Sequence, residues 1–246
     1  MNNPLSRRLQ NFTRLSPDDH RALDSLSRSG VRRVQARRDL IQEGDRPRSI
    51  YLVLEGWACR YKQLPDGRRQ VVALFMPGNL CDLNVFILSQ MDHSIGALSS
   101  LKVAEIGRDE FDQLMTEYPR ITQALFWDEL VTMATQREWT LNLGQRTAHE
   151  RIAHLLVEVY HRLRSVGLTD GNSCDFPLTQ SDIADASGLT SVHVNRMLQE
   201  LRREKMIELS SRRLTILDLG ALESAAMFND NYLHLKHEGR HLDANA

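Results

Sequence analysis

The chain has 246 residues, of which 41% are hydrophobic and 26% are charged, so it can bury one large core or two ordinary ones. Its net charge of -1 excludes a uniformly basic polycation and an acidic solvating chain. Any surface that binds nucleic acid must therefore be a local patch.

No apolar run approaches the roughly 18 to 20 residues that a membrane helix needs, and the N-terminus lacks the pattern of a secretory signal. Cys59, Cys81 and Cys174 are odd in number and never at CxxC spacing, which favours three reduced thiols over a disulfide framework or a metal nest. We therefore expect a cytoplasmic protein with no membrane association, no cofactor and no metal.

Residues 31 to 106 have the sequence pattern of a β domain. Short amphipathic helices are predicted before it, in residues 5 to 29. The segments 49–54, 58–64 and 70–75 are strand-like, and Pro65-Asp66-Gly67 is a turn. Glycines at 44, 56, 67 and 78 fall every 11 or 12 residues. This spacing predicts a stack of short strands closed by tight turns.

A long helix is predicted after Pro119, because no Gly or Pro occurs before Gly144. Apolar residues follow a heptad alternation that only Glu138 breaks, so the helix is predicted to pair with a second copy of itself. The predicted dimer seam consists of Ala124, Trp127, Val131, Ala134 and Leu141. In the alternative, the helix packs only on its own β domain, with Phe126, Leu130 and Met133 available for that face.

Gly144 is interpreted as a hinge, followed by a second helix over about 147–166 and a turn-rich loop to Phe176. Residues 177–209 then show a helix-turn-helix pattern. Thr179 and Asp182 resemble a capping box, Gly188 allows a tight turn, and Thr190 can cap the next helix. In that second helix the apolar stripe is predicted at Val194, Met197, Leu198 and Leu201.

The opposite face of this helix is polar and basic, with side chains that can bond to base edges or to phosphates. Between Arg196 and Arg213 there are six basic residues against three acidic ones, a local excess of +3 in a neutral protein. Strand-like segments 207–209 and 214–217 flank Ser210 to Arg213 and predict a hairpin wing with a basic tip. Together these features predict an interface with double-stranded DNA.

In this order, the features resemble the cyclic-AMP receptor protein and fumarate-nitrate regulator (Crp/Fnr) family of bacterial transcription regulators. The resemblance covers about residues 20 to 218. It is carried by the segments LIQEGDRPRSIYLVLEGWACRYKQLPDGRRQVVALFMPGNL, VAEIGRDEFDQLMTEYP and LTQSDIADASGLTSVHVNRMLQELRREKMIEL.

The resemblance implies an α+β chain with an N-terminal cyclic-nucleotide-binding-like β-roll (jelly roll) and a C-terminal winged helix-turn-helix. We expect an effector-sensing domain at 1–118, a dimerisation helix at 119–143, a DNA-binding domain at 144–219 and a C-terminal extension at 220–246. A homodimer reading a palindromic operator with the 190–204 helix, and RNA polymerase as a further partner, are also implied.

The effector pocket departs from the cyclic-AMP-binding members. The family's ribose-binding and phosphate-binding pairs correspond here to Asp82-Leu83 and His93-Ser94, and both pairs are altered, so cyclic-AMP sensing is not expected. Gln136 and Arg137 match positions that meet the adenine. The absence of any cysteine before Cys59 excludes the family's N-terminal iron-sulfur cluster.

The sequence leaves several alternatives for what the N-terminal domain senses. They are an unidentified small-molecule effector, haem held by His93 or a cysteine, pH acting through His93, and oxidation of Cys59 or Cys81; the protein could also act without an effector. A winged helix that docks a protein is the alternative to DNA binding. No catalytic motif supports an enzyme.

The recognition helix also departs from many relatives, because Ser191-Val192 replaces their Arg-Glu pair while the later Arg196 remains. The predicted base readers are Ser191, Val192, Asn195 and Arg196. The residues matching phosphate-contacting positions are Thr179, Gln180, Thr190, Ser210 and Arg212.

Overall fold

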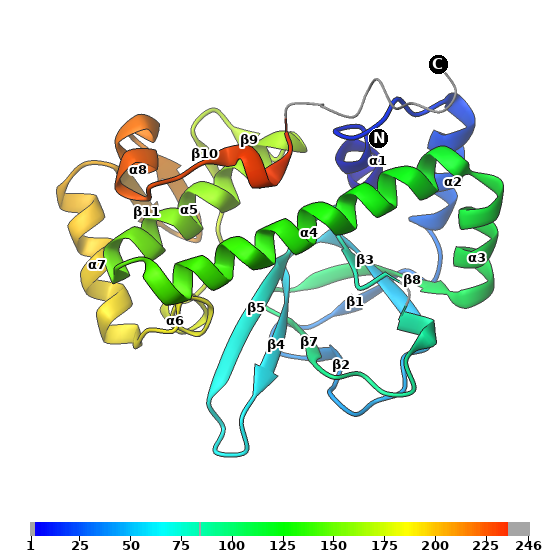
Figure 1. The fold of residues 1–246 in the computed structure, drawn as a ribbon, viewed down its shortest axis with the longest axis horizontal. Coiled ribbons are helices and arrows are strands. Elements are labelled where there is room, and N and C mark those ends of the chain that lie inside the picture. The colour runs from blue at the N-terminus through cyan, green and yellow to red at the C-terminus, as the bar shows by residue number, and fades with distance from the viewer. Residues whose placement is uncertain (1–2, 84, 236–246) are drawn as a thin grey trace. The chain divides into compact units, whose positions relative to one another are not determined.

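The computed structural model describes residues 3–83 and 85–235, which form two compact units that divide within one helix. Unit 1 comprises residues up to 62 and 73–133, and unit 2 comprises residues 63–72 and 134–233. Figure 1 shows strands and helices in both units. The predicted domain boundaries at 118/119, 143/144 and 219/220 remain a prediction, and residues 236–246 of the predicted extension lie outside the described part.

Two four-stranded sheets, ordered β1-β8-β3-β6 and β2-β7-β4-β5, belong to unit 1 except for Gln63 of β4 and residues 69–72 of β5, which are assigned to unit 2. The strands are β1 Arg32–Val34, β2 Asp39–Ile41, β3 Ser49–Glu55, β4 Ala58–Gln63, β5 Arg69–Phe75, β6 Leu80–Cys81, β7 Ser94–Ala97 and β8 Leu101–Gly107. The helices are α1 Pro4–Leu9, α2 Pro17–Leu26, the 3-10 turn η1 Val85–Ile87, α3 Arg108–Glu117 and the first half of α4 Pro119–Gln145. This arrangement confirms the predicted β-roll and α+β class.

The glycine spacing does mark tight turns. Gly56, between β3 and β4, has φ +79, a backbone conformation that residues with a side chain rarely adopt. A Cβ at this position would stand 2.1 Å from the Ser100 carbonyl oxygen. Glycine is therefore required for the two sheets to connect here.

Unit 2 contains the second half of α4 and a smaller sheet ordered β11-β12-β10-β9. Its other elements are α5 Ala148–Ser165, β9 Thr169–Asp170, β10 Ser173–Asp175, α6 Gln180–Ser187, α7 Ser191–Arg203, β11 Ile207–Ser210, β12 Arg213–Ile216, α8 Leu219–Ala225 and η2 Asp230–Leu233. The helix α4 runs through Gly144 and ends at Gln145, one residue after the predicted break. The next helix starts where Thr147 and Glu150 form a capping box.

The C-terminal segment packs on α5 around a fully buried carboxylate, Glu158. Its oxygens accept from Trp139 Nε1 (3.0 Å), Arg162 Nη1 (3.1 Å) and the Tyr232 hydroxyl (2.9 Å). Burial raises the pKa of Glu158, while the Arg162 charge acts in the opposite direction. Through Tyr232, η2 is bonded into the interior of unit 2.

Candidate nucleic-acid interface

The first helix of the predicted helix-turn-helix, α6, has the capping box that the sequence indicates. The Thr179 hydroxyl accepts from the Asp182 backbone N–H, and Asp182 Oδ2 accepts from the Thr179 backbone N–H at 2.9 Å. At the other end Gly188 takes a left-handed conformation (φ +63) and directs the chain into α7. The turn between the two helices is therefore fixed by local sequence.

The second helix, α7, begins at the predicted cap, because Thr190 Oγ1 accepts from the His193 backbone N–H. The predicted stripe of Val194, Met197, Leu198 and Leu201 is buried. The opposite face is open: the Val192 side chain is 81% exposed, Arg196 is exposed, and Ser191 and Asn195 are half-buried. All four predicted base readers thus lie on the accessible side of α7.

Two pairs of side chains bond to each other along this face. Arg196 Nη2 donates to His193 Nε2 at 2.9 Å, and Gln199 Nε2 donates to Asn195 Oδ1 at 2.9 Å. The contacts join residues three and four apart, which are neighbours on a helix surface. Two predicted base readers are therefore held by a neighbour on the same helix.

The predicted wing is the hairpin β11–β12, whose turn is tighter than expected and contains only Ser211 and Arg212. Both have positive φ (+50 and +61), as in the two-residue turns that match the twist of antiparallel strands. Asn and Gly are the usual residues there, so Ser211 and Arg212 adopt a strained backbone conformation in this turn. Arg202 Nη2 donates to the Leu209 carbonyl oxygen and ties α7 to the wing.

The basic residues of this region divide into two groups. Arg213 is paired with Asp170 at 2.9 Å. Five other exposed basic residues of this region make no ion pair with any residue that the structure describes: Arg196, Arg202, Arg203, Lys205 and Arg212. The five predicted phosphate-contacting residues, Thr179, Gln180, Thr190, Ser210 and Arg212, are all exposed. This surface can donate several hydrogen bonds to phosphates.

In unit 1, the structure brings two predicted effector-pocket residues, Asp82 and His93, into direct contact. His93 Nε2 lies 2.8 Å from Asp82 Oδ2, and Asp82 Oδ1 also accepts from Arg60 Nη2. The other ring nitrogen of His93 lies 2.7 Å from Asp92 Oδ1. Burial and the Arg60 charge lower the pKa of His93, whereas the hydrogen bond to Asp92 acts in the opposite direction.

The cluster of Arg60, Asp82 and His93 is largely enclosed, with side chains 19%, 10% and 12% exposed. The sequence did not reveal Arg60, because it lies on β4, 22 residues from Asp82 along the chain. The one signal was a charged residue within an otherwise strand-like segment.

The other predicted pocket residues are distributed differently. The Ser94 hydroxyl accepts from the Glu43 backbone N–H at 2.9 Å, and Leu83 packs partly buried against the core of unit 1. Gln136 and Arg137 belong to unit 2, where Gln136 Nε2 donates to the Val72 carbonyl oxygen. Their participation in one effector pocket remains a prediction.

The three cysteines are free thiols and all are buried. Burial raises the pKa of Cys81 far above its ordinary value and that of Cys174 to about 12. Since the thiolate is the form that reacts with oxidants, these environments do not favour an exposed redox sensor.

The predicted dimer seam requires a correction. Ala124, Val131 and Ala134 are at most 5% exposed within a single chain, and Trp127 packs partly buried against Phe12. Ala124 and Val131 belong to the core of unit 1, so they leave little side-chain surface for a second copy; of the predicted set only Leu141 is exposed, at 46%.

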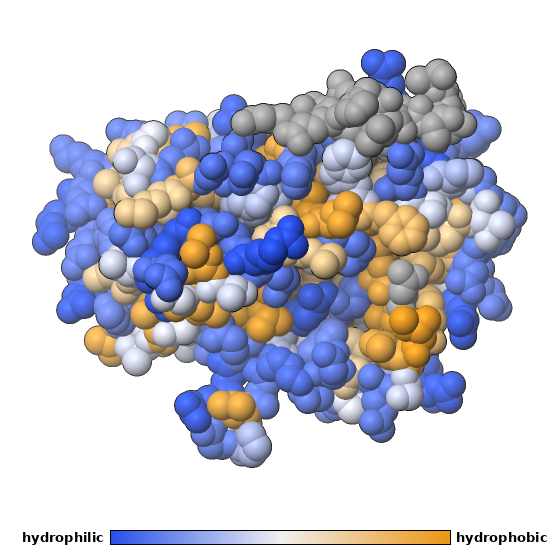
Figure 2. Space-filling view, in the orientation of Figure 1, coloured by the Kyte–Doolittle hydropathy of each residue, from blue (hydrophilic) through white to orange (hydrophobic). Residues whose placement is uncertain are grey.

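The face of α4 left exposed in unit 1 carries Phe126, Leu130 and Met133, which are 56%, 61% and 55% exposed. In the view of Figure 2, apolar surface lies over α4 and around η1. These three residues are spaced four and three apart and form a second apolar stripe on α4. The sequence prediction assigns this stripe to packing on the helix's own β domain and therefore misses it as a candidate dimer interface.

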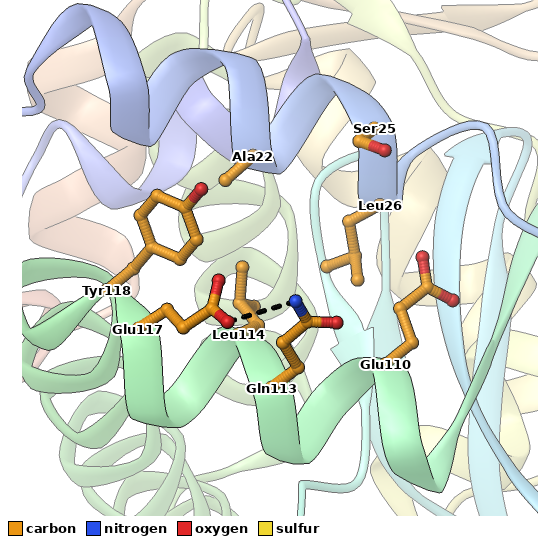
Figure 3. A pocket seen from close by; sticks show the side chains of 8 residues that line it. All are labelled: Ala22, Ser25, Leu26, Glu110, Gln113, Leu114, Glu117 and Tyr118. Atoms are coloured by element: carbon orange, nitrogen blue, oxygen red, sulfur yellow. Dashed lines mark hydrogen bonds between the residues drawn. The ribbon is translucent and has the colours of Figure 1, made fainter.

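An open groove of about 150 Å³ lies between α2 and α3 (Figure 3). Leu26 and Leu114 lie on its apolar side, while Gln113 Nε2 donates to Glu117 Oε1 at 3.0 Å at its rim. None of the predicted site residues lines it.

Within residues 3–83 and 85–235, no helix is long and apolar enough to cross a membrane.

Two family models match the chain. Residues 31–118 match a cyclic nucleotide-binding domain, and residues 150–225 match a Crp-like helix-turn-helix domain. The transcriptional activator protein FnrL of Cereibacter sphaeroides is 31% identical over 76% of this chain and 75% of its own length.

Two solved structures share the fold. FixK2 from Bradyrhizobium japonicum has a TM-score of 0.71 at 23% identity, over 79% of this chain and 96% of that one. The c-di-GMP responsive global regulator CLP of Xanthomonas campestris has a TM-score of 0.63 at 18% identity, over 80% and 99%. The helix-turn-helix geometry, the two domain matches and the identity to FnrL lead to one conclusion: the chain belongs to the Crp/Fnr family of transcription regulators.

Proposed function

We propose that the protein acts as a cytoplasmic homodimer that reads a palindromic DNA site with one α7 helix from each copy. The observation that carries this proposal is the open face of α7, where exposed basic and polar side chains stand opposite a fully buried apolar stripe. Such a helix fits the major groove, and two-fold symmetry of a dimer matches an inverted repeat.

The residues on α7 have different roles in this proposal. Arg196 can form two hydrogen bonds to O6 and N7 of a guanine, and the exposed Val192 can contact a thymine methyl group. Ser191 and Asn195 lie beside them and supply further polar contacts. Base preference should depend most strongly on Arg196, because bidentate contacts discriminate best.

The exposed caps and the wing would hold the DNA backbone. Thr179, Gln180 and Thr190 lie at the N-termini of α6 and α7, where backbone N–H groups favour an anion. Ser210 and Arg212 lie at the wing. Contacts of this kind position the domain without reading sequence.

The apolar stripe of Phe126, Leu130 and Met133 supports the dimer, since large apolar side chains this exposed usually mark an interface. Leu130→Glu would place a charge at its centre. We expect sedimentation to show that this variant is mainly monomeric, while Thr116→Glu, an exposed control on α3, remains dimeric. A dimeric Leu130→Glu protein would contradict this interface.

We propose that unit 1 senses its signal without cyclic AMP and without an iron-sulfur cluster. The argument rests on Asp82, which is paired with Arg60 and His93 inside the chain and is an anion where cyclic AMP would bring a second one. CLP is named as responsive to a different nucleotide, c-di-GMP. An unidentified small-molecule effector and RNA polymerase remain proposed partners.

The test is the selection of random duplexes by the purified full-length protein at near-physiological salt, with and without cyclic AMP. We expect enrichment of an inverted repeat whose half-site centres lie about one helical turn apart. Cyclic AMP should not change the result. Lack of salt-sensitive affinity for any duplex would contradict DNA reading and favour a winged helix that docks a protein.

A further inference from the structure

The α7 face contains a side-chain contact that the DNA-reading roles above do not use. His193 lies three residues before Arg196, and its Nε2 accepts a hydrogen bond from Arg196 Nη2 at 2.9 Å. In the described part of the chain, Arg196 is the only side chain to which His193 is hydrogen-bonded. The contact therefore links a titratable ring to the arginine assigned to base reading.

We propose that His193 is a positioning residue: its neutral ring holds the Arg196 guanidinium in the orientation that reads a base, and protonation of the ring releases it. The proposal rests on the proposed function of Arg196. It makes base discrimination at one position of each half-site dependent on pH.

The donor and acceptor roles in this contact are fixed by chemistry. A guanidinium has only donors, so His193 Nε2 must carry its lone pair, and the ring must be neutral with its proton on Nδ1. The contact uses one hydrogen of Nη2 and leaves those on Nε and Nη1, and the second on Nη2, for a base. Holding a long side chain in advance lowers the conformational entropy lost on binding.

Protonation reverses the interaction. An imidazolium has no acceptor, and two cations three residues apart on one helix repel each other. Imidazole is the side chain that ordinarily changes charge between pH 5 and 8. The released Arg196 would still attract phosphates, and the new charge on His193 would attract them as well.

Among the residues that the structure describes, no carboxylate forms a hydrogen bond or an ion pair with the His193 ring. Glu200 on α7 makes no ion pair with it in the described part of the chain. On the adjoining α6, Asp182 is bonded to Thr179, and Asp185 lies 3.6 Å from Arg69. Arg196, three residues along α7, is the positive charge that a charged ring would meet, whereas Arg202 and Arg203 lie about 14–15 Å away along the helix axis.

A second pair on the same face serves as a control. Gln199 Nε2 donates to Asn195 Oδ1, and neither side chain titrates. Gln199→Ala should therefore alter readout at the base that Asn195 meets, while its preference at the Arg196 position should match that of wild type at each pH, including the decrease on acidification.

The experiment starts from the enriched duplex and locates the base pair at which Arg196→Ala loses preference. Affinities for that duplex and for one substituted at this base pair are then compared for wild type, His193→Ala, His193→Gln and Gln199→Ala, at about pH 8 and about pH 5.5. Far-UV circular dichroism checks folding. A non-specific duplex and the salt dependence serve as further readouts.

At the higher pH we expect His193→Ala to lose about two- to twelve-fold of the preference at this base pair alone, the range of one net hydrogen bond. Acidification should reduce the preference of wild type and increase its affinity for the non-specific duplex. His193→Gln keeps an acceptor at both pH values, so its preference should stay constant.

Unchanged preference in His193→Ala, or equal loss on acidification in wild type and His193→Gln, would overturn the proposal. Failure of the proposed function would look different. In that case wild type would select no duplex, or Arg196→Ala would lose affinity equally for all sequences.

Discussion

In unit 1 the Arg60 guanidinium is paired with Asp82 inside the chain, whereas in unit 2 the Arg196, Arg203 and Arg212 guanidiniums have no carboxylate partner among the described residues. The first charge is largely enclosed and the other three are exposed. Enclosed charges require compensation within the fold, while exposed ones are available to a polyanion. The enclosed Arg60 charge is thus satisfied within the chain, whereas the three exposed charges of unit 2 are available to an external partner.

The largest effect should come from breaking the enclosed pair. Asp82→Ala would leave Arg60 buried without its carboxylate, which typically costs about 3–5 kcal/mol of stability, somewhat less here because water reaches the pair. Urea unfolding followed by circular dichroism measures the loss. The double variant Arg60→Leu with Asp82→Ala should recover much of it, and no recovery would mean that Asp82 matters for another reason.

The exposed cations should behave differently from one another. Arg196→Ala should reduce discrimination at one base pair by about 1–3 kcal/mol, because it removes a bidentate contact. Arg212→Ala should weaken binding to all duplexes alike and reduce the salt slope by about one. Titrations of specific and substituted duplexes at several salt concentrations distinguish them. Equal loss on all sequences for Arg196→Ala would remove it from the base readers.

A smaller effect is expected from His154, a buried residue of unit 2. Its Nδ1 accepts from Asn142 Nδ2 at 3.0 Å, and its Nε2 faces Glu138 Oε1 at 3.3 Å, as suits a neutral ring protonated on Nε2. Burial, followed by the Arg146 charge, lowers the pKa of His154 to about 3.

Because this pKa is lower in the folded state than in the unfolded chain, the unfolded state binds more protons as pH falls. Stability contributed by the neutral ring is thus present above about pH 6.5 and decreases below it, by at most about 1.4 kcal/mol per pH unit. His154→Gln should flatten the dependence of unfolding free energy on pH between about 6 and 4, whereas His20→Gln, on α2, should not. Identical curves for His154→Gln and wild type would show that His154 does not titrate on unfolding.

The sequence predicted what is determined locally. The caps at Thr179 and Thr190, the left-handed Gly188 and the buried stripe of α7 each depend on residues a few positions apart, and each is confirmed. The β-strands followed from alternation and turn residues. Local signals sufficed because helix ends and tight turns satisfy their own backbone groups.

The dimer seam failed for a different reason. Two apolar stripes run along α4, and periodicity alone does not say which one packs on the β-roll of the same chain. Burial of Ala124 and Val131 decides this, and it depends on contacts across long sequence separations. The pair of Arg60 and Asp82 was missed for the same reason.

The hydrogen bond between Tyr232 and Glu158 bears on how this regulator can be engineered. Because η2 is bonded into the interior of unit 2, a chain shortened to the end of the matched helix-turn-helix at residue 225 would remove the Tyr232 donor from a buried carboxylate. Such a chain would report a weakened fold instead of DNA affinity. Fusions joined after residue 235 keep the donor, and they are the form in which binding assays should be made.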